Sequence, residues 1–313
     1  MSTIACIVGS FQVFTEANKH FERRGMKPLF RIELVGATMS RFLQDQFLTV
    51  THHTSVKKVI KTNLVIIPAC AVRGYETATA NNKTLIDWVA KQYRQGAEVA
   101  SMCIGGFMLA ATGLLSGKAC STHWALAEEF KHQFPDVHLQ TDKLITDDDG
   151  IYTNGGAYSF LHLLMYLVEK FYDRATAIHC AKYFQIDLDR HAQSEFVIFT
   201  GQKKHNDEVV LKAQQYIERN YRDKLSIETL SSKVGAGRRN FDRRFIKATG
   251  LTPFDYVQRV KIEAAKKAFE TSRKSVSEVM YDVGYNDTKA FREVFHRVTG
   301  LSPIDYKGKY NKG

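Results

Sequence analysis

The sequence predicts two domains: an α/β domain whose mostly parallel sheet has helices on both faces, and an all-α domain with two helix-turn-helix units. The chain has 313 residues, which exceeds the size at which one hydrophobic core usually suffices. Apolar runs alternate with helical patterns in the first part, as in parallel sheets with crossover helices. A segment near the end repeats at an offset of fifty residues. We therefore expect domains over residues 1–195 and 207–313, joined by a linker at 196–206.

In the first domain, apolar runs predict the strands and amphipathic patterns predict the helices. Strands are expected at residues 4–8, 30–35, 64–68, 99–103 and 150–153, and helices at residues 83–94 and 159–171. The second of these helices is apolar on nearly all sides. Such a helix is either deeply buried or part of a subunit interface, through which the domain would form a homodimer.

Charge is distributed unevenly along the chain. The formal net charge is +11, and residues 207–313 hold 22 Lys and Arg against 14 Asp and Glu, whereas residues 1–206 hold 22 against 19. A basic domain suits a polyanionic partner, because Lys and Arg that neutralise phosphates release condensed counterions. A merely solvated basic surface is the alternative.

The five cysteines are odd in number and scattered, without a C-x-x-C pair. Reduced thiols in the cytoplasm fit this pattern best. The first residues lack the basic segment of a secretory leader, and no stretch approaches the roughly 18 apolar residues of a membrane span. We expect a cytoplasmic protein with no membrane partner, no metal and no cofactor.

The internal repeat has the pattern of two helix-turn-helix units. Residues 249–256 read TGLTPFDY and residues 299–306 read TGLSPIDY. Upstream, residues 226–235 correspond to residues 275–284 at an offset of forty-nine. Each copy reads as a Ser-capped short helix, a turn that contains glycine, and a second helix with two Phe one turn apart. A helical pattern over residues 253–270 links the copies as a rigid spacer.

In the first unit, Phe241 and Phe245 should face the core, which leaves the opposite face of the same helix for DNA. Arginine binds guanine O6 and N7 in a bidentate manner, and asparagine binds adenine N6 and N7 in the same way. Contact with phosphates alone is the alternative for each residue. The candidate contacts on this face are Arg238, Arg239, Asn240, Arg243 and Lys247.

The equivalent face of the second unit has a different chemistry. Glu293 stands at the position of Arg243, where a carboxylate weakens attraction to phosphate but accepts a hydrogen bond from cytosine N4. Two units at a fixed separation can enter successive major grooves, about 34 Å apart, so we expect one chain to read a bipartite site. The candidate contacts here are Thr288, Lys289, Arg292 and Arg297.

Several motifs of the last hundred residues occur together in one known family. They are YDVGYNDTKAF at residues 281–291, GLSP at residues 300–303, and the order of repeats, linking helix and closing turns. With them, residues 207–308 resemble the DNA-binding domain of the AraC/XylS family. Gly237 departs from the pattern, since a Ser N-cap is common there, and Gly is the weaker cap by a few tenths to about 1 kcal/mol. The resemblance implies a bacterial transcription regulator that binds double-stranded DNA, with RNA polymerase as a further partner.

In the first domain, residues 99–110 read as a strand, a sharp turn at Cys103 and a helix. By analogy with G-x-S-x-G, this is a nucleophile elbow, which exposes one side chain at the carboxyl end of the sheet. The helix N-terminus would favour the thiolate of Cys103, and ligand clefts occupy the same edge of open α/β sheets. His123 supplies an imidazole for a Cys-His pair. A small residue required by the turn and a hydrogen-bonded pocket wall are the alternatives for these two residues.

Gly155 and Gly156 follow the strand expected at residues 150–153. They place backbone N–H groups at the start of the next helix, where a carboxylate or another anion could bind. A close strand-to-helix packing turn is the alternative.

The Cys103 turn and the following loop with His123 resemble the ThiJ/PfpI-type domain of the class I glutamine amidotransferase-like superfamily. The resemblance covers residues 1–195 and implies a flavodoxin-like fold, and such domains often precede an AraC-type domain in bacterial regulators. Proteases of this family place a His directly after the nucleophilic Cys, and glutaminases carry a late His-x-Glu pair. Here Ile104 follows Cys103 and no late pair of this kind is present. The resemblance makes Glu16 a candidate for the acid beside the elbow.

Together these features predict a sequence-specific DNA-binding transcription regulator, not an enzyme, that is controlled by a small-molecule effector. We expect the effector at Cys103, His123, Gly155 and Gly156, where its binding would change the arrangement or mobility of the DNA-binding domains. Two alternatives remain. One is a cysteine hydrolase or amidase fused to the DNA-binding domain, and the other is a redox or electrophile sensor at Cys103.

Overall fold

The computed structural model describes residues 3–37, 42–44, 49–51, 54–69, 82–189 and 192–311. The chain divides into two compact units, Met1–Gln193 and Ser194–Gly313. The division lies close to the end of the first expected domain. The whole of the expected linker, residues 196–206, therefore belongs to the second unit.

A four-stranded sheet forms the centre of the first unit. Its order is β5 (Leu64–Ile67), β6 (Glu98–Met102), β10 (Ile151–Asn154) and β9 (Ile145–Asp148). The first three strands run parallel, and β9 pairs antiparallel with β10 at the edge. The parallel strands confirm three of the expected strands to within one residue at each end. All residues of β10 are buried, as in a strand covered on both faces.

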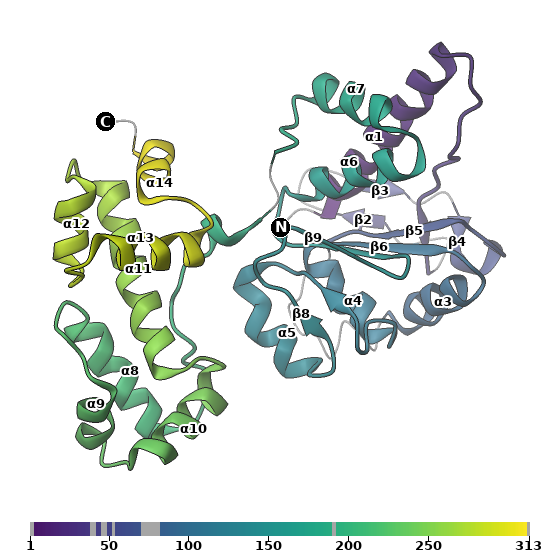
Figure 1. The fold of residues 1–313 in the computed structure, drawn as a ribbon. Coiled ribbons are helices and arrows are strands. Elements are labelled where there is room, and N and C mark those ends of the chain that lie inside the picture. Colours follow the sequence, from purple (N-terminus) through teal and green to yellow (C-terminus); the bar gives the residue numbers. More distant parts are fainter. Residues whose placement is uncertain are drawn as a thin grey trace. The chain divides into compact units, whose positions relative to one another are not determined.

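Helices cover both faces of this sheet, as predicted (Figure 1). One side carries α3 (Lys83–Arg94) and α4 (Gly106–Ala111), and the other carries α1 (Thr3–Arg23), α6 (Phe160–Phe171) and α7 (Arg174–Phe184). α6 packs on β10, α1 and α7 and buries six of its apolar side chains. Deep burial, the first of the two alternatives for this helix, therefore explains its composition.

Shorter elements complete the described part of the first unit. β1 (Val35–Gly36) pairs with β4 (Thr54–Ser55), β2 (Phe42–Gln44) with β3 (Thr49–Thr51), and β7 (Ala119–Cys120) with β8 (His138–Leu139). The 3₁₀ turns in this part are η1 (Val56–Lys58), η2 (Cys103–Gly105) and η3 (Trp124–Leu126). One further helix is α5 (Ala127–Gln133).

The prediction of a strand at residues 4–8 is wrong, because these residues lie in α1. Their apolar run is the start of a longer stripe with helical spacing, which continues through the buried Val13 and Phe14. Periodicity alone cannot assign a short apolar run. Gly9 allows α1 to approach α6 closely, since a Cβ there would lie 2.6 Å from the ring of Phe160.

The strand predicted at residues 30–35 is confirmed only at Val35, in β1. At the start of this segment, Asn18 provides the hydrogen bonds that a neighbouring strand would make. Its Oδ1 accepts from the N–H groups of Leu29 at 3.1 Å and Phe30 at 3.3 Å, and its Nδ2 donates to the carbonyl of Phe30 at 2.7 Å. Side-chain bonds of this kind compete with ladder pairing.

The second unit contains the two predicted helix-turn-helix units. Figure 1 shows α8, α9 and α10 at one end of the long helix α11, and α12, α13 and α14 at the other. Phe241 and Phe245 are buried in the first core, and Phe291 and Phe295 in the second. The helices α8 to α14 are Glu208–Asn220, Ile227–Lys233, Arg238–Thr249, Pro253–Thr271, Val276–Asp282, Thr288–Thr299 and Pro303–Tyr310.

The helix caps follow the predicted pattern. Ser275 and Glu278 form a capping box at the start of α12. Gly284 adopts a φ of +77°, and a Cβ on it would lie 2.1 Å from the carbonyl oxygen of Arg222, so only glycine fits this turn. Gly237 supplies no side-chain cap to α10, whereas Asp287 caps α13. None of the described helices is long and apolar enough to cross a membrane.

Candidate functional site

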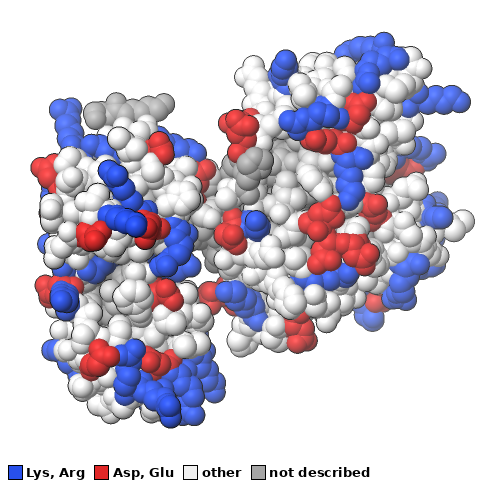
Figure 2. Space-filling view, viewed as in Figure 1, with Lys and Arg blue, Asp and Glu red and all other residues white. Residues whose placement is uncertain are grey.

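The surface of α10 has the predicted division into a buried and an exposed face. Phe241 and Phe245 are fully buried beneath the helix. Figure 2 shows Lys and Arg side chains gathered over α10, where they form a basic surface. All five candidate contacts are exposed: Arg238, Arg239, Asn240, Arg243 and Lys247.

Two arginines on this face have partners within the unit. Arg238 Nε donates to Asp242 at 2.8 Å, and its guanidinium also pairs with Glu228 of α9. Arg243 donates to Oδ1 of Asn240 at 3.1 Å. Arg238 therefore joins the two helices of the turn, which favours a positioning role over the base contact predicted for it. The hydrogen bond joins Arg243 and Asn240 on the exposed face of α10.

Arg244, which was not among the predicted residues, fixes α10 on α8. Its guanidinium binds Asp207 in a bidentate manner, with N–O distances of 2.7 and 2.8 Å. Asp207 also caps α8 by accepting the N–H of Val210 at 3.1 Å. The hydrogen bonds from Arg244, together with this cap, hold the pKa of Asp207 below its usual range. The sequence analysis did not single out Asp207, and the preference for Asp at N-caps was the only signal that could have found it.

The exposed face of α13 carries Thr288, Lys289, Arg292 and Glu293. Lys289 lies 4.0 Å from Glu293 on the next turn. Arg297 instead reaches back to α11, where it bonds to Gln258 and lies 3.9 Å from Asp255. This favours a positioning role for Arg297 over the DNA contact predicted for it.

Sequence reasoning also missed one exposed position in each recognition helix. Ile246 of α10 is 46% exposed, and the offset of fifty maps it onto His296, which is exposed on α13. Ile246 lies seven positions after Arg239, and His296 seven positions after Lys289, so each lies on the same helix face as a candidate contact. The repeat itself was the signal that could have found them.

Cys103 occupies the predicted sharp turn between β6 and α4. Its φ of +55° lies in the left-handed region, which is strained for a residue with a side chain, and it is fully buried. The N–H of Cys103 donates to Oδ1 of Asn154 at 3.1 Å, and its carbonyl accepts the hydroxyl of Thr122 at 3.1 Å. β10 and the loop after β7 thus hold the turn in place.

His123 follows Thr122 in the loop after β7. Its Nδ1 accepts the N–H of Ala125 at 3.1 Å, so the imidazole caps the turn η3. This bond requires Nδ1 to be unprotonated, and burial lowers the pKa of His123. The residue is therefore neutral near pH 7, with Nε2 as its N–H donor.

Gly155 fits the packing alternative better than the anion site. Its N–H donates to the carbonyl of Leu144 at 2.8 Å, which corrects the prediction that this group is available to an anion. A Cβ on Gly155 would lie 2.1 Å from Nε2 of Gln193 and 2.6 Å from Oγ of Ser121. Gly156 has a φ of +87°, and its role at an effector site stays a prediction.

Gln193, the residue packed against Gly155, was also missed. It is fully buried at the very end of the first unit, although glutamine is mostly exposed in proteins. Its Nε2 donates to the carbonyl of Thr122 at 3.0 Å, so it touches the same residue that bonds to Cys103. No local pattern in the sequence marks this residue.

Glu16 lies in α1 and is 5% exposed. Its Oε1 bonds to Nε2 of His179 at 2.9 Å and to the guanidinium of Arg23 at 3.2 Å. Burial raises the pKa of Glu16, but the hydrogen bond with His179 and the charge of Arg23 outweigh burial and bring the pKa below its ordinary value. The role of Glu16 beside the elbow stays a prediction.

The other described cysteines, Cys6, Cys120 and Cys180, are buried thiols. Burial raises the pKa of Cys120 and Cys180 to about 12, so both stay protonated and unreactive at neutral pH. Cys70 lies outside the described residues. Among the residues that are described, no three His, Cys, Asp or Glu side chains are grouped so as to hold a metal ion.

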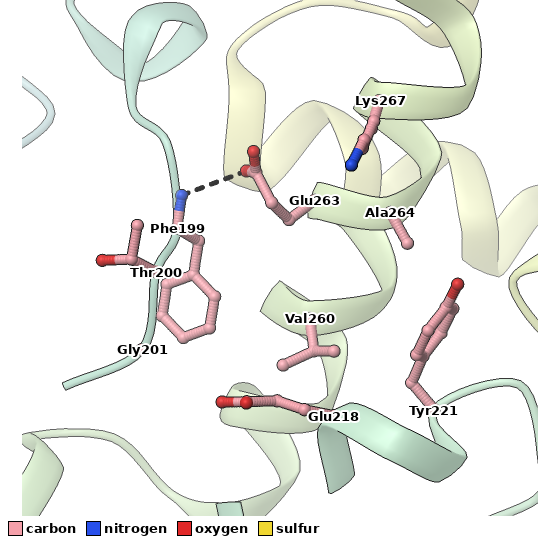
Figure 3. Close-up of a pocket in the computed structure, with 9 residues that line it drawn as sticks. All are labelled: Phe199, Thr200, Gly201, Glu218, Tyr221, Val260, Glu263, Ala264 and Lys267. Atoms are coloured by element: carbon pink, nitrogen blue, oxygen red, sulfur yellow. Dashed lines mark hydrogen bonds between the residues drawn. The ribbon is translucent and has the colours of Figure 1, made fainter. Parts of the chain in front are cut away.

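A pocket of about 290 Å³ lies within the second unit, where residues 199–201 pass along α11 (Figure 3). Its two carboxylates are engaged by neighbours: Glu263 accepts the N–H of Phe199 at 3.1 Å, and Glu218 accepts the hydroxyl of Tyr256 at 2.8 Å. No sequence pattern predicted this pocket. It is lined by Phe199, Thr200, Gly201, Glu218, Tyr221, Val260, Glu263, Ala264 and Lys267.

Comparisons with known proteins agree with this architecture. Residues 230–309 match a family described as a helix-turn-helix domain, and residues 21–170 match the DJ-1/PfpI family. A crystal structure of a transcriptional regulator protein from Vibrio parahaemolyticus is similar with a TM-score of 0.52 and 22% identity, over 58% of this chain and 93% of that one. This likeness shows a shared fold, and with the DJ-1/PfpI match it confirms the flavodoxin-like prediction.

Two relatives from Pseudomonas aeruginosa are similar over much of the chain. The HTH-type transcriptional regulator GbdR is 24% identical over 226 residues, which are 70% of this chain and 60% of GbdR, so the match spans less than two thirds of that relative. The HTH-type transcriptional regulator CdhR is 21% identical over 277 residues, which are 88% of this chain and 81% of CdhR. The chain therefore carries an AraC-type helix-turn-helix domain behind a DJ-1/PfpI-type domain, as the sequence predicts.

Proposed function

We propose that this protein is a sequence-specific DNA-binding transcription regulator that reads a bipartite site in double-stranded DNA. The observation that carries the proposal is the pair of exposed recognition faces on α10 and α13, each supported by two buried phenylalanines and joined by the single helix α11. Relatives named as HTH-type transcriptional regulators support it.

In the first half-site, Arg239 and Arg243 are the base contacts. Asn240 accepts a hydrogen bond from Arg243, which limits the rotamers of that long side chain and lowers the entropy cost of a bidentate contact with guanine. Lys247, one turn after Arg243, meets the phosphate backbone. Ile246 lies on the same face and offers an apolar contact to a thymine methyl group.

In the second half-site, Thr288, Lys289 and Arg292 are the contacts, and Glu293 accepts from cytosine N4. A carboxylate on the recognition face repels phosphate, so α13 gains less from the DNA backbone than α10 does. The two half-sites therefore differ in sequence and in the salt dependence of their contacts.

The first unit acts as a sensor for a small-molecule effector that binds beside Cys103, His123 and Gly156. Full burial of Cys103 and the neutral, backbone-bonded His123 favour binding over nucleophilic turnover. The first unit also forms the homodimer, and the DNA-bound protein contacts RNA polymerase.

The DNA proposal is tested by selecting short duplexes from a genomic library across a salt series. Wild type is compared with the double variant Arg239→Ala/Arg243→Ala. Arg94→Ala is the control, because it removes an exposed cation from α3 in the first unit. Enrichment of one bipartite motif by wild type and control, with loss of one half-site in the double variant, is expected. Uniform, steeply salt-sensitive binding by all three would contradict sequence-specific reading.

The sensor proposal is tested with metabolite mixtures and thermal unfolding of wild type and Cys103→Ser. A compound that stabilises wild type, changes its DNA affinity and acts more weakly on the variant is the expected result. Turnover of amides or esters that Cys103→Ala abolishes, with DNA binding intact, would instead establish the hydrolase alternative.

A further inference from the structure

Gln193 lies where the two units join. It is the last residue of the first unit, and Ser194 is the first residue of the second. The side chain of Gln193 is fully buried within the first unit, and its backbone N–H donates to the carbonyl of Asp142 at 3.0 Å. The residue is thus anchored through both backbone and side chain at the end of its unit.

The carboxamide nitrogen of Gln193 faces three oxygen acceptors. Nε2 lies 3.0 Å from the carbonyl of Thr122, 3.3 Å from the carbonyl of Lys143 and 3.3 Å from Oγ of Ser121. Ser121 donates its own hydrogen to Lys143 O at 2.6 Å, so its Oγ is an acceptor toward Gln193. The opposite amide orientation would place an oxygen against these acceptors, and the network therefore fixes the assignment.

The carboxamide oxygen is poorly matched to the same place. Oε1 is buried and has no hydrogen-bond partner among the described residues. An amide NH₂ has only two hydrogens for three acceptors, whereas a terminal ammonium group has three. The three acceptor oxygens thus form a site for a hydrogen-bond donor, which we call the donor site, and the Gln193 carboxamide satisfies it incompletely. The buried Oε1 without a partner also makes this placement of the side chain less stable.

This donor site adjoins the elbow turn. Thr122 accepts from Gln193 through its carbonyl and donates its hydroxyl hydrogen to the carbonyl of Cys103, so two hydrogen bonds connect Gln193 to the elbow. The absence of a side chain on Gly155 leaves the space that Nε2 fills. The elbow and the end of the first unit are therefore connected through one residue, Thr122.

Residues 194–201 follow Gln193 in the chain, and we call them the strap. They make hydrogen bonds, an ion pair and a ring contact with the rest of the second unit. Glu195 pairs with Lys309 of α14 at 2.6 Å. Lys266 of α11 donates to the carbonyl of Val197, and the ring of Phe199 packs edge to face on Tyr256. Figure 3 shows the strap along α11, with the bond from the Phe199 N–H to Glu263. The strap belongs to the second unit, and it follows Gln193 directly in the chain.

We propose that the carboxamide of Gln193 is a latch that occupies a subsite for the terminal amino or carboxamide group of the effector. A ligand N–H donor that replaces Nε2 at the acceptor oxygens of Ser121, Thr122 and Lys143 displaces the side chain of Gln193. The junction between Gln193 and the strap is then released. The inference rests on the proposed effector control, and it names both the chemistry that the effector carries and the residue through which binding reaches the DNA-binding unit.

The latch is tested without effector or DNA. Gln193→Met keeps the size of the side chain but removes the donor, and Gln193→Glu places an acceptor against three acceptors. Gln140→Met is the matched control, since Gln140 is exposed in the same unit. Amide hydrogen exchange is followed at the N–H groups of Gln193 and Gly155. Both latch variants are expected to exchange there at least several-fold faster than wild type and control, and wild-type rates would overturn the proposal.

Release of the junction is measured by rotational anisotropy decay of a dye on Lys212→Cys in α8, a position exposed in the second unit. The latch variants are expected to show a shorter rotational correlation time than wild type. An unchanged correlation time would show that Gln193 does not restrain the second unit.

The subsite is tested by chemical rescue of Gln193→Ala with propionamide, propylammonium and, as a control, propionate. Propionamide, propylammonium or both are expected to restore slow exchange in a saturable manner, and the more effective one identifies a neutral amide or an ammonium group as the preferred ligand. Rescue by neither, or equal rescue by propionate, would overturn the donor subsite. Failure of the DNA selection would leave these results unaffected, so failure of the latch and failure of the proposed function can be told apart.

Discussion

The two helix-turn-helix units share a buried framework and differ on their surfaces. Tyr256 and Tyr306 occupy equivalent places, are 0% and 2% exposed, and each donates its hydroxyl hydrogen to a glutamate, Glu218 or Glu270. On the recognition faces, by contrast, Arg243 corresponds to Glu293 and Ile246 to His296. Packing preserves the framework in both helix-turn-helix units, whereas the residues proposed to contact bases differ between them.

The units also differ in how their recognition helices are held. Arg244 ties α10 to Asp207 through an ion pair, and the equivalent residue of α13 is Val294, which is buried in the apolar core. The N-cap of α10 is Gly237, which has no side chain to cap the helix, while the N-cap of α13 is Asp287, which accepts the N–H of Ala290 at 2.9 Å. The first helix depends on a charged contact and the second on packing and a cap.

The largest effects are expected from the cores. Phe245→Ala and Phe295→Ala should each lower the free energy of unfolding by about 3–5 kcal/mol, because each leaves a cavity among fully buried side chains. Circular dichroism should register the loss, while fluorescence of Trp88 and Trp124, both in the first unit, should change little. Ile304→Ala, at a site 70% exposed, is the control. If the losses of unfolding free energy in Phe245→Ala and Phe295→Ala are not additive in the double variant, α11 couples the two cores into one cooperative unit.

The next largest effects concern DNA reading. Arg243→Ala should weaken binding by about 1–3 kcal/mol and relax preference at one base pair of the first half-site. Glu293→Ala should relax preference in the second half-site, with affinity for non-specific duplex unchanged or higher, because a negative charge is removed. Fluorescence anisotropy on duplexes with single base changes measures both. If Arg243→Ala and Glu293→Ala relaxed base preference in the same half-site, the assignment of one helix-turn-helix to each half-site would be wrong.

The ion pair between Arg244 and Asp207, in the first helix-turn-helix, makes a smaller and pH-dependent contribution. The pKa of Asp207 is depressed in the folded protein, so its stabilisation is complete above the unfolded-state pKa and is lost as the pH falls through the lower folded-state pKa. Asp207→Asn keeps the cap but loses the ion pair, and it should cost about 1 kcal/mol near neutral pH. Urea unfolding of both proteins from neutral to acid pH should show this difference shrinking toward zero below about pH 4. A difference independent of pH would exclude the ion pair as its cause.

The smallest effect is expected at the missing cap. Gly237→Ser should stabilise α10 by a few tenths of a kcal/mol, roughly the difference between the two residues as N-caps. Asp287→Ala should cost about 1 kcal/mol at the start of α13, since Ala cannot cap. Thermal unfolding of the two variants measures both changes. A destabilising Gly237→Ser would mean that the chain before α10 requires glycine for another reason.

The local features of the molecule could be predicted from the sequence. Gly235, Gly250, Gly284 and Gly300 all have positive φ at the helix ends where the repeat places them, and the elbow at Cys103 follows from a short strand and helix around a small residue. Residues 4–8 could not be predicted in this way, because an apolar run of five residues satisfies a strand and a buried helix equally. The neighbours in α6 and α7 decide in favour of the helix.

The sequence by itself determined the two domains, the paired recognition helices and the faces on which Arg239, Arg243 and Glu293 stand. These depend on helical periodicity, caps and turns, which act within a few residues. Only the tertiary structure decided that Arg238 and Arg297 bind neighbouring helices, and that Gln193 fills a donor site 71 residues away from Thr122. Hydrogen bonds form between atoms about 3 Å apart, and packing alone brings such distant residues to that separation.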